Sequence, residues 1–215
     1  MILAAGKGSR LAPLTNTVPK PMLPVQGKPL IQWQVEALAK RGIHNLVINL
    51  HHLGEQIENH LGDGTAYNVN IHYSREETLL ETGGGIRRAL PQFKGQPFYL
   101  INGDIWSDFD FASLPQNLPC GCAHIVVTPT PNFRERGDFN YAHGIITQRG
   151  DDYVYCGIAV LSEQIFSSFA PTSASASFSL RDIYFQLIEN QQLHAQVHQG
   201  TWLDIGTIEQ YNSVK

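Results

Sequence analysis

The residues with the clearest chemical potential stand at the very start of the chain, where an apolar run leads into a glycine-rich polar turn, Met1-Ile2-Leu3-Ala4-Ala5-Gly6-Lys7-Gly8-Ser9-Arg10-Leu11. The apolar part predicts a short buried strand, and in a parallel α/β sheet ligands bind just beyond the carboxyl ends of the strands. Gly6 and Gly8 allow the backbone to approach an anion closely. Ser9 adds a hydroxyl, and Arg10 carries a forked cation that suits phosphate oxygens. The turn therefore predicts a phosphate-binding loop, although an ordinary turn with cations facing water has the same composition.

The same turn excludes two common nucleotide-binding motifs. After Gly6-x-Gly8 the chain continues with Arg10 and Leu11, where a dinucleotide-binding fingerprint has its third glycine. No Gly-Lys-Ser/Thr sequence closes the turn, as it would in a Walker loop. A hydride-transferring enzyme is accordingly disfavoured.

Lys20 lies between Pro19 and Pro21 in a segment, residues 11–24, that contains four prolines. Such a segment excludes an α-helix and a central strand, and we expect it to be stiff and extended. A lysine held between prolines has little backbone freedom. The pattern favours a cation that the backbone holds in a defined position. The alternative is that a lysine occurs by chance in a proline-rich loop.

Three consecutive glycines, Gly83 to Gly85, precede a short helical pattern that continues to Leu90. Glycine inside an element costs about 0.5–1 kcal/mol relative to alanine. A bare backbone is useful where a flat ring must lie against peptide groups, so Gly83 and Gly84 are candidates for binding a nucleobase. The competing interpretation is a flexible loop.

Two carboxylates end predicted strands. Asp104 follows the apolar run 97–103, and Asp204 follows a strand that begins near Val197. A hard carboxylate beside a phosphate site suits Mg²⁺, which takes few protein ligands and shares phosphate oxygens. The alternative for each aspartate is a turn or a helix cap.

Composition limits the class of protein. The chain has 215 residues, 42% of them hydrophobic and 16% charged, with a net charge of −4, which fits one soluble domain without an electrostatic surface for nucleic acid or membrane. Cys120, Cys122 and Cys156 do not form a disulfide framework, and the nine histidines show no zinc motif. Neither a basic leader nor an apolar run of about 18 residues is present. We expect a cytoplasmic protein.

The hydrophobic pattern of the first half alternates strands with helices. Strands are predicted at residues 2–5, 46–50 and 69–73, and helices at 29–41 and 53–61. In the second half we expect strands at 121–128, 140–147 and 151–161, a Ser/Ala-rich loop at 170–179, and a helix from Leu180 with Ser179 and Asp182 as a capping box. A final strand and a short helix close the chain. This order predicts an α/β fold, a doubly wound, Rossmann-like, mixed and mostly parallel sheet.

Four segments together resemble the sugar-1-phosphate nucleotidyltransferases: Leu3-Ala4-Ala5-Gly6-x-Gly8-x-Arg10, Pro19-Lys20-Pro21-Met22, Asn102-Gly103-Asp104 and Trp202-x-Asp204-x-Gly206-Thr207. The resemblance covers essentially the whole chain, with the segments in the expected order. It implies one domain, residues 1–215, with a nucleotide-binding half (1–110) and a sugar-binding half (111–215).

The resemblance also implies roles for individual residues. Arg10, Lys20 and Asp104 would be catalytic, and Asp104 and Asp204 would hold Mg²⁺. The nucleotide would contact Gly6, Gly8, Ser9, Arg10, Lys20, Gly83, Gly84 and Asn102. The sugar would contact Asn102, Asp138, Asn140 and Gly157.

Within the family, residues 80–85, 102–106 and 136–139 resemble the branch that transfers UMP from UTP to N-acetylmuramate 1-phosphate, with release of pyrophosphate, in peptidoglycan recycling. The alternatives are a mannose-1-phosphate guanylyltransferase, a glucose-1-phosphate thymidylyltransferase or a non-catalytic nucleotide-sugar sensor. The expected partners are small molecules only, and the pattern leaves the choice between monomer and homo-oligomer open.

Overall fold

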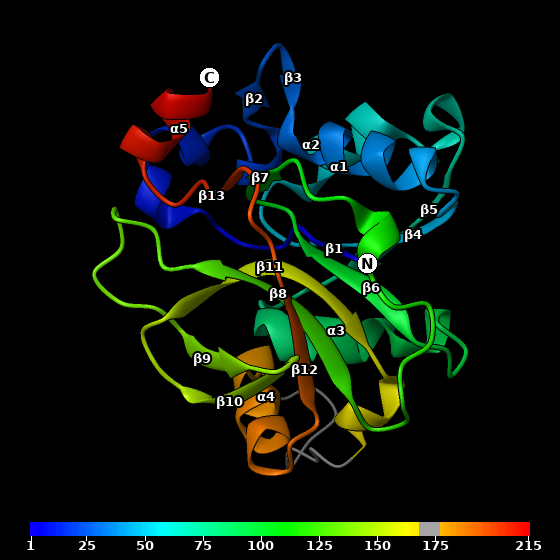
Figure 1. Ribbon diagram of the computed structural model, residues 1–215. Coiled ribbons are helices and arrows are strands. Elements are labelled where there is room, and N and C mark those ends of the chain that lie inside the picture. Colours follow the sequence, from blue (N-terminus) through cyan, green and yellow to red (C-terminus); the bar gives the residue numbers. More distant parts are fainter. Residues whose placement is uncertain (168–176) are drawn as a thin grey trace.

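A computed structural model describes residues 1–167 and 177–215, and the described chain is built around a nine-stranded sheet (Figure 1). The strand order is β5-β4-β1-β6-β11-β8-β12-β10-β9. The strands are β1 (Ile2–Leu3), β4 (Asn45–Leu50), β5 (Asn70–Arg75), β6 (Phe98–Asn102), β8 (Ala123–Pro129), β9 (Phe139–Ala142), β10 (Ile145–Arg149), β11 (Tyr153–Leu161) and β12 (Leu193–Val197). The first four strands of this order run parallel, and β6 pairs antiparallel with β11. The sheet is thus mixed and mostly parallel, as expected.

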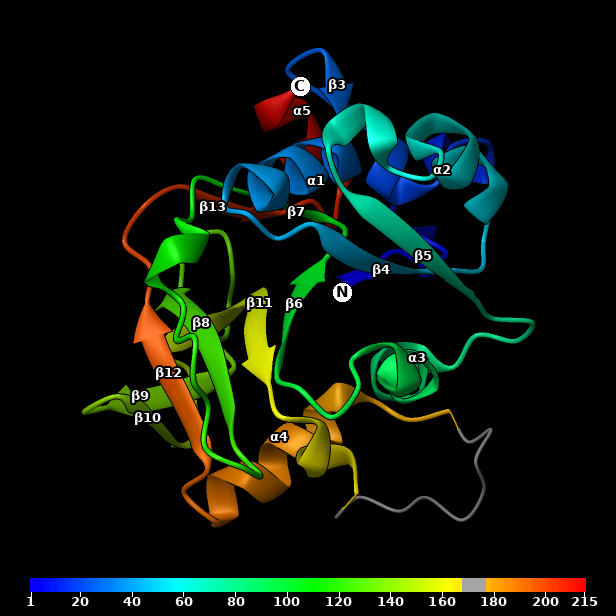
Figure 2. The same ribbon diagram turned by 90° about the vertical axis from the view of Figure 1, so that its right-hand side faces the viewer.

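Helices cover both faces of the sheet, which is the doubly wound arrangement (Figure 2). The helices are α1 (Leu30–Lys40), α2 (Gly54–Leu61), α3 (Glu81–Ala89), α4 (Leu180–Glu189) and α5 (Ile208–Val214). One buried cluster contains Val35 of α1 and Ile57 of α2, and a second contains Ile86 of α3 and Ile183 of α4. A sheet covered on both faces explains why β4 reads as an almost continuous apolar run.

Two short ribbons lie outside the main sheet. β2 (Pro24–Val25) pairs with β3 (Lys28–Pro29), and β7 (Ile105–Ser107) pairs antiparallel with β13 (Trp202–Asp204). The second ribbon begins directly after β6 and connects the two halves of the sequence. It is the element that positions the acidic residues described below.

The strand register places three polar segments of the chain at one edge of the sheet. Leu3 lies opposite Asn49 of β4 on one side and opposite Asn102 of β6 on the other. Because these strands are parallel, the residues that follow each of them emerge together. The glycine-rich turn, Asn49 and Asp104 therefore share one edge.

The structure corrects two local expectations. Residues 11–24 are not extended, because three 3₁₀ turns (Ser9–Leu11, Leu14–Asn16 and Lys20–Met22) fold the proline-rich segment. The strand expected at 140–147 is a hairpin of β9 and β10, since His143 and Gly144 turn with φ of 51° and 87°. Both torsion angles lie in the left-handed region that a continuous strand does not use.

Helix ends also differ in part from expectation. Ser179 caps α4, but its hydroxyl accepts from the N–H of Arg181, two residues on, and the capping box occurs instead at Thr207 and Gln210 before α5. Thr207 is therefore the cap of α5, which leaves Asp204 free of that role. The predicted loop at 170–179 lies largely outside the described residues.

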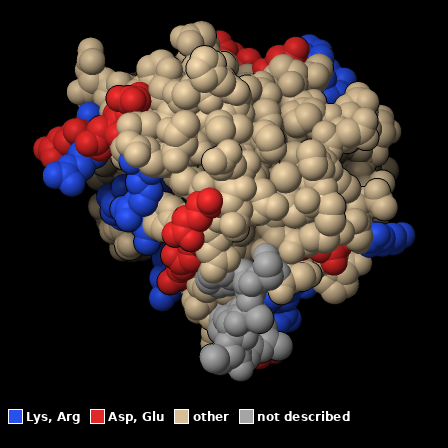
Figure 3. Space-filling model, turned by 60° about the horizontal axis from the view of Figure 1, so that its bottom comes forward, with Lys and Arg blue, Asp and Glu red and all other residues tan. Residues whose placement is uncertain are grey.

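Charged side chains are dispersed on the face of the described chain that Figure 3 shows. On the face shown in Figure 3, described basic and acidic side chains form small separate groups on a largely uncharged surface. A nucleic-acid-binding face would carry a continuous basic strip. None of the helices in residues 1–167 and 177–215 has the length and apolar character needed to cross a membrane.

Candidate active site

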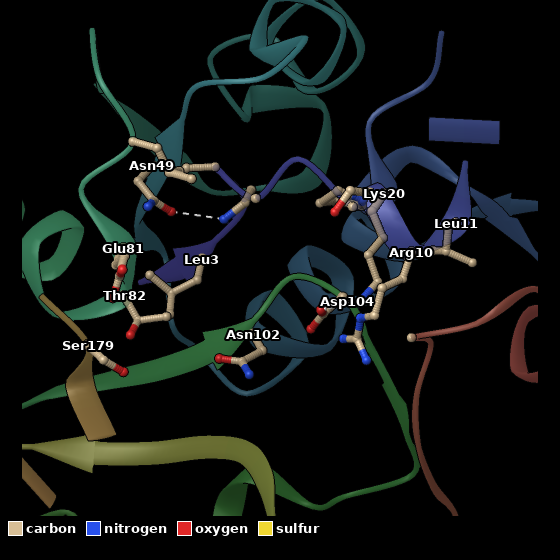
Figure 4. Close-up of a pocket in the computed structure, with 18 residues that line it drawn as sticks. Leu3, Arg10, Leu11, Lys20, Asn49, Glu81, Thr82, Asn102, Asp104 and Ser179 are labelled. Carbon is tan, nitrogen blue, oxygen red and sulfur yellow. Dashed lines mark hydrogen bonds and ion pairs between the residues drawn. The ribbon is translucent and has the colours of Figure 1, made fainter. Parts of the chain in front are cut away.

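A cavity of about 420 Å³ opens at the sheet edge where β1, β4 and β6 end (Figure 4). It brings together seven of the residues predicted to bind nucleotide or metal or to act in catalysis: Gly6, Gly8, Ser9, Arg10, Lys20, Asn102 and Asp104. In Figure 4 the basic residues Arg10 and Lys20 lie at one end, together with Asp104, and Thr82 and Ser179 lie at the other. The cavity is therefore polarised, with its cations at one end.

Gly8 shapes the loop at the cationic end. Its φ is +64°, a conformation that L side chains rarely adopt, and it precedes the 3₁₀ turn Ser9–Leu11. The Thr15 hydroxyl donates to the Gly8 carbonyl at 2.9 Å, and a Cβ at Gly8 would lie 3.0 Å from Thr15 Cγ2. Gly6 differs, since nothing lies within 4 Å of a Cβ built there. Gly6 thus leaves open backbone on the cavity, as close approach of a ligand requires.

Arg10 reaches from this loop toward the residues that follow β13. A Cβ at Gly206 would lie 3.2 Å from Arg10 Nη1, so the absence of a side chain at Gly206 admits the guanidinium. Arg10 forms no ion pair with any described residue. Lys7, the other cation of the turn, is exposed and does not line the cavity. Arg10 is the loop cation available to an anion in the cavity.

Lys20 is the best-anchored cation of the site. Only 9% of its side chain is exposed, and its Nζ lies 2.5 Å from Asp104 Oδ2 and 3.7 Å from Asp204 Oδ1. The two carboxylates meet because β13 pairs with β7, which sets Asp204 opposite Ile105, the neighbour of Asp104. This arrangement fixes the Lys20 side chain between two carboxylates, and it brings together all three residues that the resemblance singled out here.

Asp204 is the electrostatically unusual member of this group. Burial raises the pKa of its carboxyl, the neighbouring charge of Asp104 raises it further, and Lys20 and Arg10 lower it in part. Its Oδ1 is buried and accepts no hydrogen bond from any described residue. A desolvated carboxylate that lies beside a second carboxylate, and has an oxygen that accepts no hydrogen bond, is stabilised by an additional cation.

These residues fit a divalent cation of the magnesium type. Two carboxylates offer hard oxygen ligands, and Mg²⁺ is typically bound by one or two carboxylates plus substrate phosphates. Among the described residues no group of three or more potential ligands gathers at one point. A cation bound between Asp104 and Asp204 would therefore take the rest of its ligands from water and from phosphate oxygens.

The glycine run does not form an open surface. Gly83, Gly84 and Gly85 are buried within α3, and the N–H groups of Gly83 and Gly84 donate to the Phe178 carbonyl at 2.9 and 3.2 Å. A Cβ at Gly83 would lie 2.3 Å from the Phe178 ring, so packing already accounts for this glycine. Contact of Gly83 or Gly84 with a base stays a prediction. Glu81 and Thr82, which precede them, line the cavity.

Sequence reasoning missed a buried polar network behind the loop. Asn49 Oδ1 accepts from the Ala4 N–H at 2.8 Å, and Asn49 Nδ2 donates to Glu76 Oε1 at 2.7 Å. Glu76 Oε2 in turn accepts from the Leu80 N–H at 3.0 Å. This chain of hydrogen bonds ties the start of the phosphate loop to the segment that leads into α3. The sequence feature that could have indicated this network is a polar residue, Asn49, within the apolar run of β4.

A second cavity, of about 290 Å³, adjoins the first and shares Leu3, Thr82, Asn102 and Ser179 with it. Asp138 lines this second cavity, and its Oδ2 accepts from the Tyr155 N–H at 2.9 Å.

The two other predicted sugar contacts do not line either cavity. Gly157 lies behind Asn102, where a Cβ would stand 2.9 Å from Asn102 Nδ2, and φ of +74° gives it a conformation suited to glycine. Asn140 is on β9, packed against Gly150. Gly157 therefore positions Asn102 by leaving it room, and direct contact of Gly157 or Asn140 with a sugar stays a prediction.

The comparisons with known proteins agree with this geometry. The profile of the nucleotidyl transferase family matches residues 1–136. The chain is 39% identical to the N-acetylmuramate alpha-1-phosphate uridylyltransferase of Neisseria meningitidis, over 97% of this chain and 93% of that protein. It is 28% identical to the protein of the same name from Caulobacter vibrioides, over 96% and 90%.

The fold has close matches among solved structures. One is a putative glucose-1-phosphate thymidylyltransferase from Bacillus anthracis, with a TM-score of 0.85 and 22% identity over 99% of this chain and 92% of that one. At this identity the match establishes the fold alone. It confirms the Rossmann-like architecture expected from the order of the elements.

Proposed function

The chain belongs to the nucleotidyl transferase family, and from that premise we propose that it transfers UMP from UTP to N-acetylmuramate 1-phosphate, giving UDP-N-acetylmuramate and pyrophosphate. The observation that carries the reaction type is the meeting of Arg10, Lys20 and Asp104 at one end of the cavity, with the Asp204 carboxylate 3.7 Å from Lys20 Nζ. Similarity over nearly the whole chain to a protein named for this reaction supports the choice of substrates. On this proposal the enzyme acts in peptidoglycan recycling.

In the proposed reaction a phosphate oxygen of the sugar phosphate attacks the α-phosphorus of UTP, and the bond to pyrophosphate breaks. Such a transfer depends on positioning and on neutralising charge more than on an acid or a base. Gly6, Gly8 and Ser9 would present the loop backbone to the triphosphate, and Arg10 would neutralise the leaving pyrophosphate. Lys20 would lie between the two reacting phosphates, held there by its ion pair with Asp104.

Asp104 and Asp204 would hold Mg²⁺. When bound, the ion neutralises phosphate charge and aligns the phosphate oxygens for in-line displacement. Without it the two carboxylates would repel a triphosphate. We therefore infer that the role of Lys20 includes holding these carboxylates in place until the nucleotide arrives.

We infer that the two adjoining cavities receive the base and the sugar separately. We infer that the uracil lies at the end of the first cavity near Glu81 and Thr82, beside Gly83 and Gly84. The sugar would extend past Asn102 into the second cavity, toward Asp138. Asn102 lines both cavities and is thus suited to contact the sugar near its reacting phosphate.

Release of pyrophosphate by the purified protein tests this proposal. The protein is given UTP with N-acetylmuramate 1-phosphate, GTP with mannose 1-phosphate, and dTTP with glucose 1-phosphate, each with and without Mg²⁺. We expect the first pair with Mg²⁺ to give the highest kcat/KM. Faster turnover of either other pair would replace the proposed substrates, and nucleotide binding without any turnover would indicate a sensor.

Asp104→Asn tests the metal assignment within the same assay. The substitution removes a negative charge from the carboxylate pair, so we expect Mg²⁺-dependent pyrophosphate release to be abolished while the fold is retained. Asp152→Asn is the matched control, because Asp152 is exposed and does not line the cavity. Unchanged activity in Asp104→Asn would overturn the assignment.

A further inference from the structure

The second cavity carries two arginines that the proposed reaction does not yet use. Arg149 ends β10 and Arg181 lies in the first turn of α4, and both line this cavity. They are the only basic side chains among the described residues that do so. In a chain with 15 lysines and arginines and a net charge of −4, two cations beside one cavity are a marked local excess.

The two guanidinium groups converge on one aromatic ring. The carbon of the Arg149 guanidinium lies 4.5 Å from the centre of the Phe185 ring, and that of Arg181 lies 6.0 Å from it. Phe185 stands on α4, one turn after Arg181, so the helix presents both side chains to the same point. A cation–π contact with a ring holds a guanidinium in place without using its N–H groups, which can still bind an anion.

Neither arginine has an acidic partner in the described part of the chain. The carboxylate that lines the cavity, Asp138, is already engaged by the Tyr155 N–H and lies 3.7 Å from Arg134 Nη1. The other polar side chains that line the cavity are uncharged: Thr82, Asn102, Ser179, Tyr155 and Tyr184. Burial raises the pKa of both tyrosines further above neutral pH. The hydroxyl of Tyr184 donates to that of Tyr155 at 3.3 Å. The cavity thus has an unbalanced positive charge on one side.

We propose that Arg149 and Arg181 bind the lactyl carboxylate of N-acetylmuramate 1-phosphate. The inference rests on the proposed function and deepens it. N-acetylmuramate differs from N-acetylglucosamine by a lactyl ether, which adds one carboxylate to an otherwise neutral pyranose. The 1-phosphate of the sugar would lie beside Lys20, at the far end of the first cavity. Arg149 and Arg181 are therefore available for a second negative charge on the same substrate.

The aromatic surface beside the arginines fits the rest of that substituent. Tyr155, Tyr184 and Phe185 line the same cavity. The rings of these three residues provide an apolar wall for the methyl group of the lactyl ether. A substrate without the lactyl group would leave both guanidinium groups unpaired but still hydrated, because both arginines are exposed. The pair therefore favours the charged sugar without excluding the neutral one.

The test is a comparison of two acceptor sugars with UTP and Mg²⁺, N-acetylmuramate 1-phosphate and N-acetylglucosamine 1-phosphate. For each variant the measured quantity is the ratio of the two kcat/KM values. A charge-assisted hydrogen bond contributes enough to change binding by about 10- to 100-fold. We expect Arg149→Gln and Arg181→Gln each to lower the ratio about tenfold or more, chiefly through KM for the muramate sugar. The double variant should come close to losing the preference.

Arg88→Gln serves as the matched control, since Arg88 is an exposed arginine on α3 that lines neither cavity. Its ratio should equal that of the unaltered protein. Turnover of the neutral sugar verifies that each variant is folded and competent.

The outcomes separate this inference from the proposed function. If the unaltered protein prefers the muramate sugar and both arginine variants keep that preference, the inference is wrong and the proposed function stands. If the unaltered protein shows no preference for the muramate sugar, both the proposed substrate and the proposed role of the arginines are wrong. Loss of the preference in the arginine variants alone supports both.

Discussion

Replacing Lys20 by methionine tests whether the charge of this lysine stabilises the two carboxylates of the candidate active site. Methionine preserves most of the length and apolar contact of the lysine stem and removes the charge. In the structure that charge is 2.5 Å from Asp104 Oδ2 and 3.7 Å from Asp204 Oδ1. The substitution leaves two neighbouring carboxylates without their shared cation.

The expected loss of stability follows from burial. Removing one partner of a buried ion pair costs about 3–5 kcal/mol. The side chains of Asp104 and Asp204 remain 32% and 33% exposed, so water partly replaces the lysine and the lower end of the range applies. A cost of about 3 kcal/mol lowers Tm by about 6–12 °C in a domain of this size. Catalysis should fall by about 10²–10³-fold, as for loss of one donor at developing charge.

Thermal unfolding and pyrophosphate release are the assays, each repeated over a range of Mg²⁺ concentrations. Because Lys20 neutralises the same carboxylates that would hold the ion, Mg²⁺ should raise the Tm of Lys20→Met more than that of the unaltered protein. Lys28→Met is the control, since Lys28 pairs with Glu36 near the surface and such pairs contribute about 0–1 kcal/mol. The reasoning is refuted if Lys20→Met retains near-normal turnover, or if its Tm falls no further than that of Lys28→Met.

Two more substitutions test neighbouring features. Asp204→Asn should raise Tm at neutral pH without Mg²⁺ and abolish the Mg²⁺ response. The raised pKa of Asp204 means that its charged form destabilises the fold. The resulting loss in the free energy of unfolding is absent below pH 3.8, the ordinary pKa of the carboxyl. It grows as pH rises from there through the folded-state pKa, and it is constant at higher pH. A stability gain that persists unchanged in acid would contradict this cause. Gly83→Ala should lower Tm by about 2–8 °C. A Cβ only 2.3 Å from the Phe178 ring belongs in the upper part of the range for overpacking, about 2–3 kcal/mol, and this cost exceeds the gain in helix propensity of about 1 kcal/mol. Gly6→Ala, where space is open, should leave Tm unchanged, and an equal loss in both would show that packing against Phe178 is not responsible.

Local patterns in the sequence were sufficient for most of the elements. The continuous apolar run of β4, the helical spacing in α1 and the strand before Asp104 depend on neighbours in the chain, and the structure confirms them. The same holds for the edge at which the candidate site residues meet, because parallel strands place their carboxyl ends together. Where local torsion angles decide the outcome, as at His143 and Gly144, the apolar pattern failed to show the turn.

The pairing of distant segments was decided only by the tertiary structure. The composition of the glycine run suggested an open surface, but the Phe178 carbonyl and ring, remote in sequence, occupy that space. The convergence of Arg149 and Arg181 on Phe185 depends on how β10 packs beside α4.

Motifs alone marked Lys20, Asp104 and Asp204 as residues of interest, since each has a residue type and a position that suit phosphate chemistry. That Asp104 and Asp204 share one lysine follows from the antiparallel pairing of β7 with β13. Hydrophobic periodicity specifies which face of a strand is buried but not which distant strand lies beside it. The sequence by itself thus determined the chemistry available to this protein, and the folded sheet determined which charges meet.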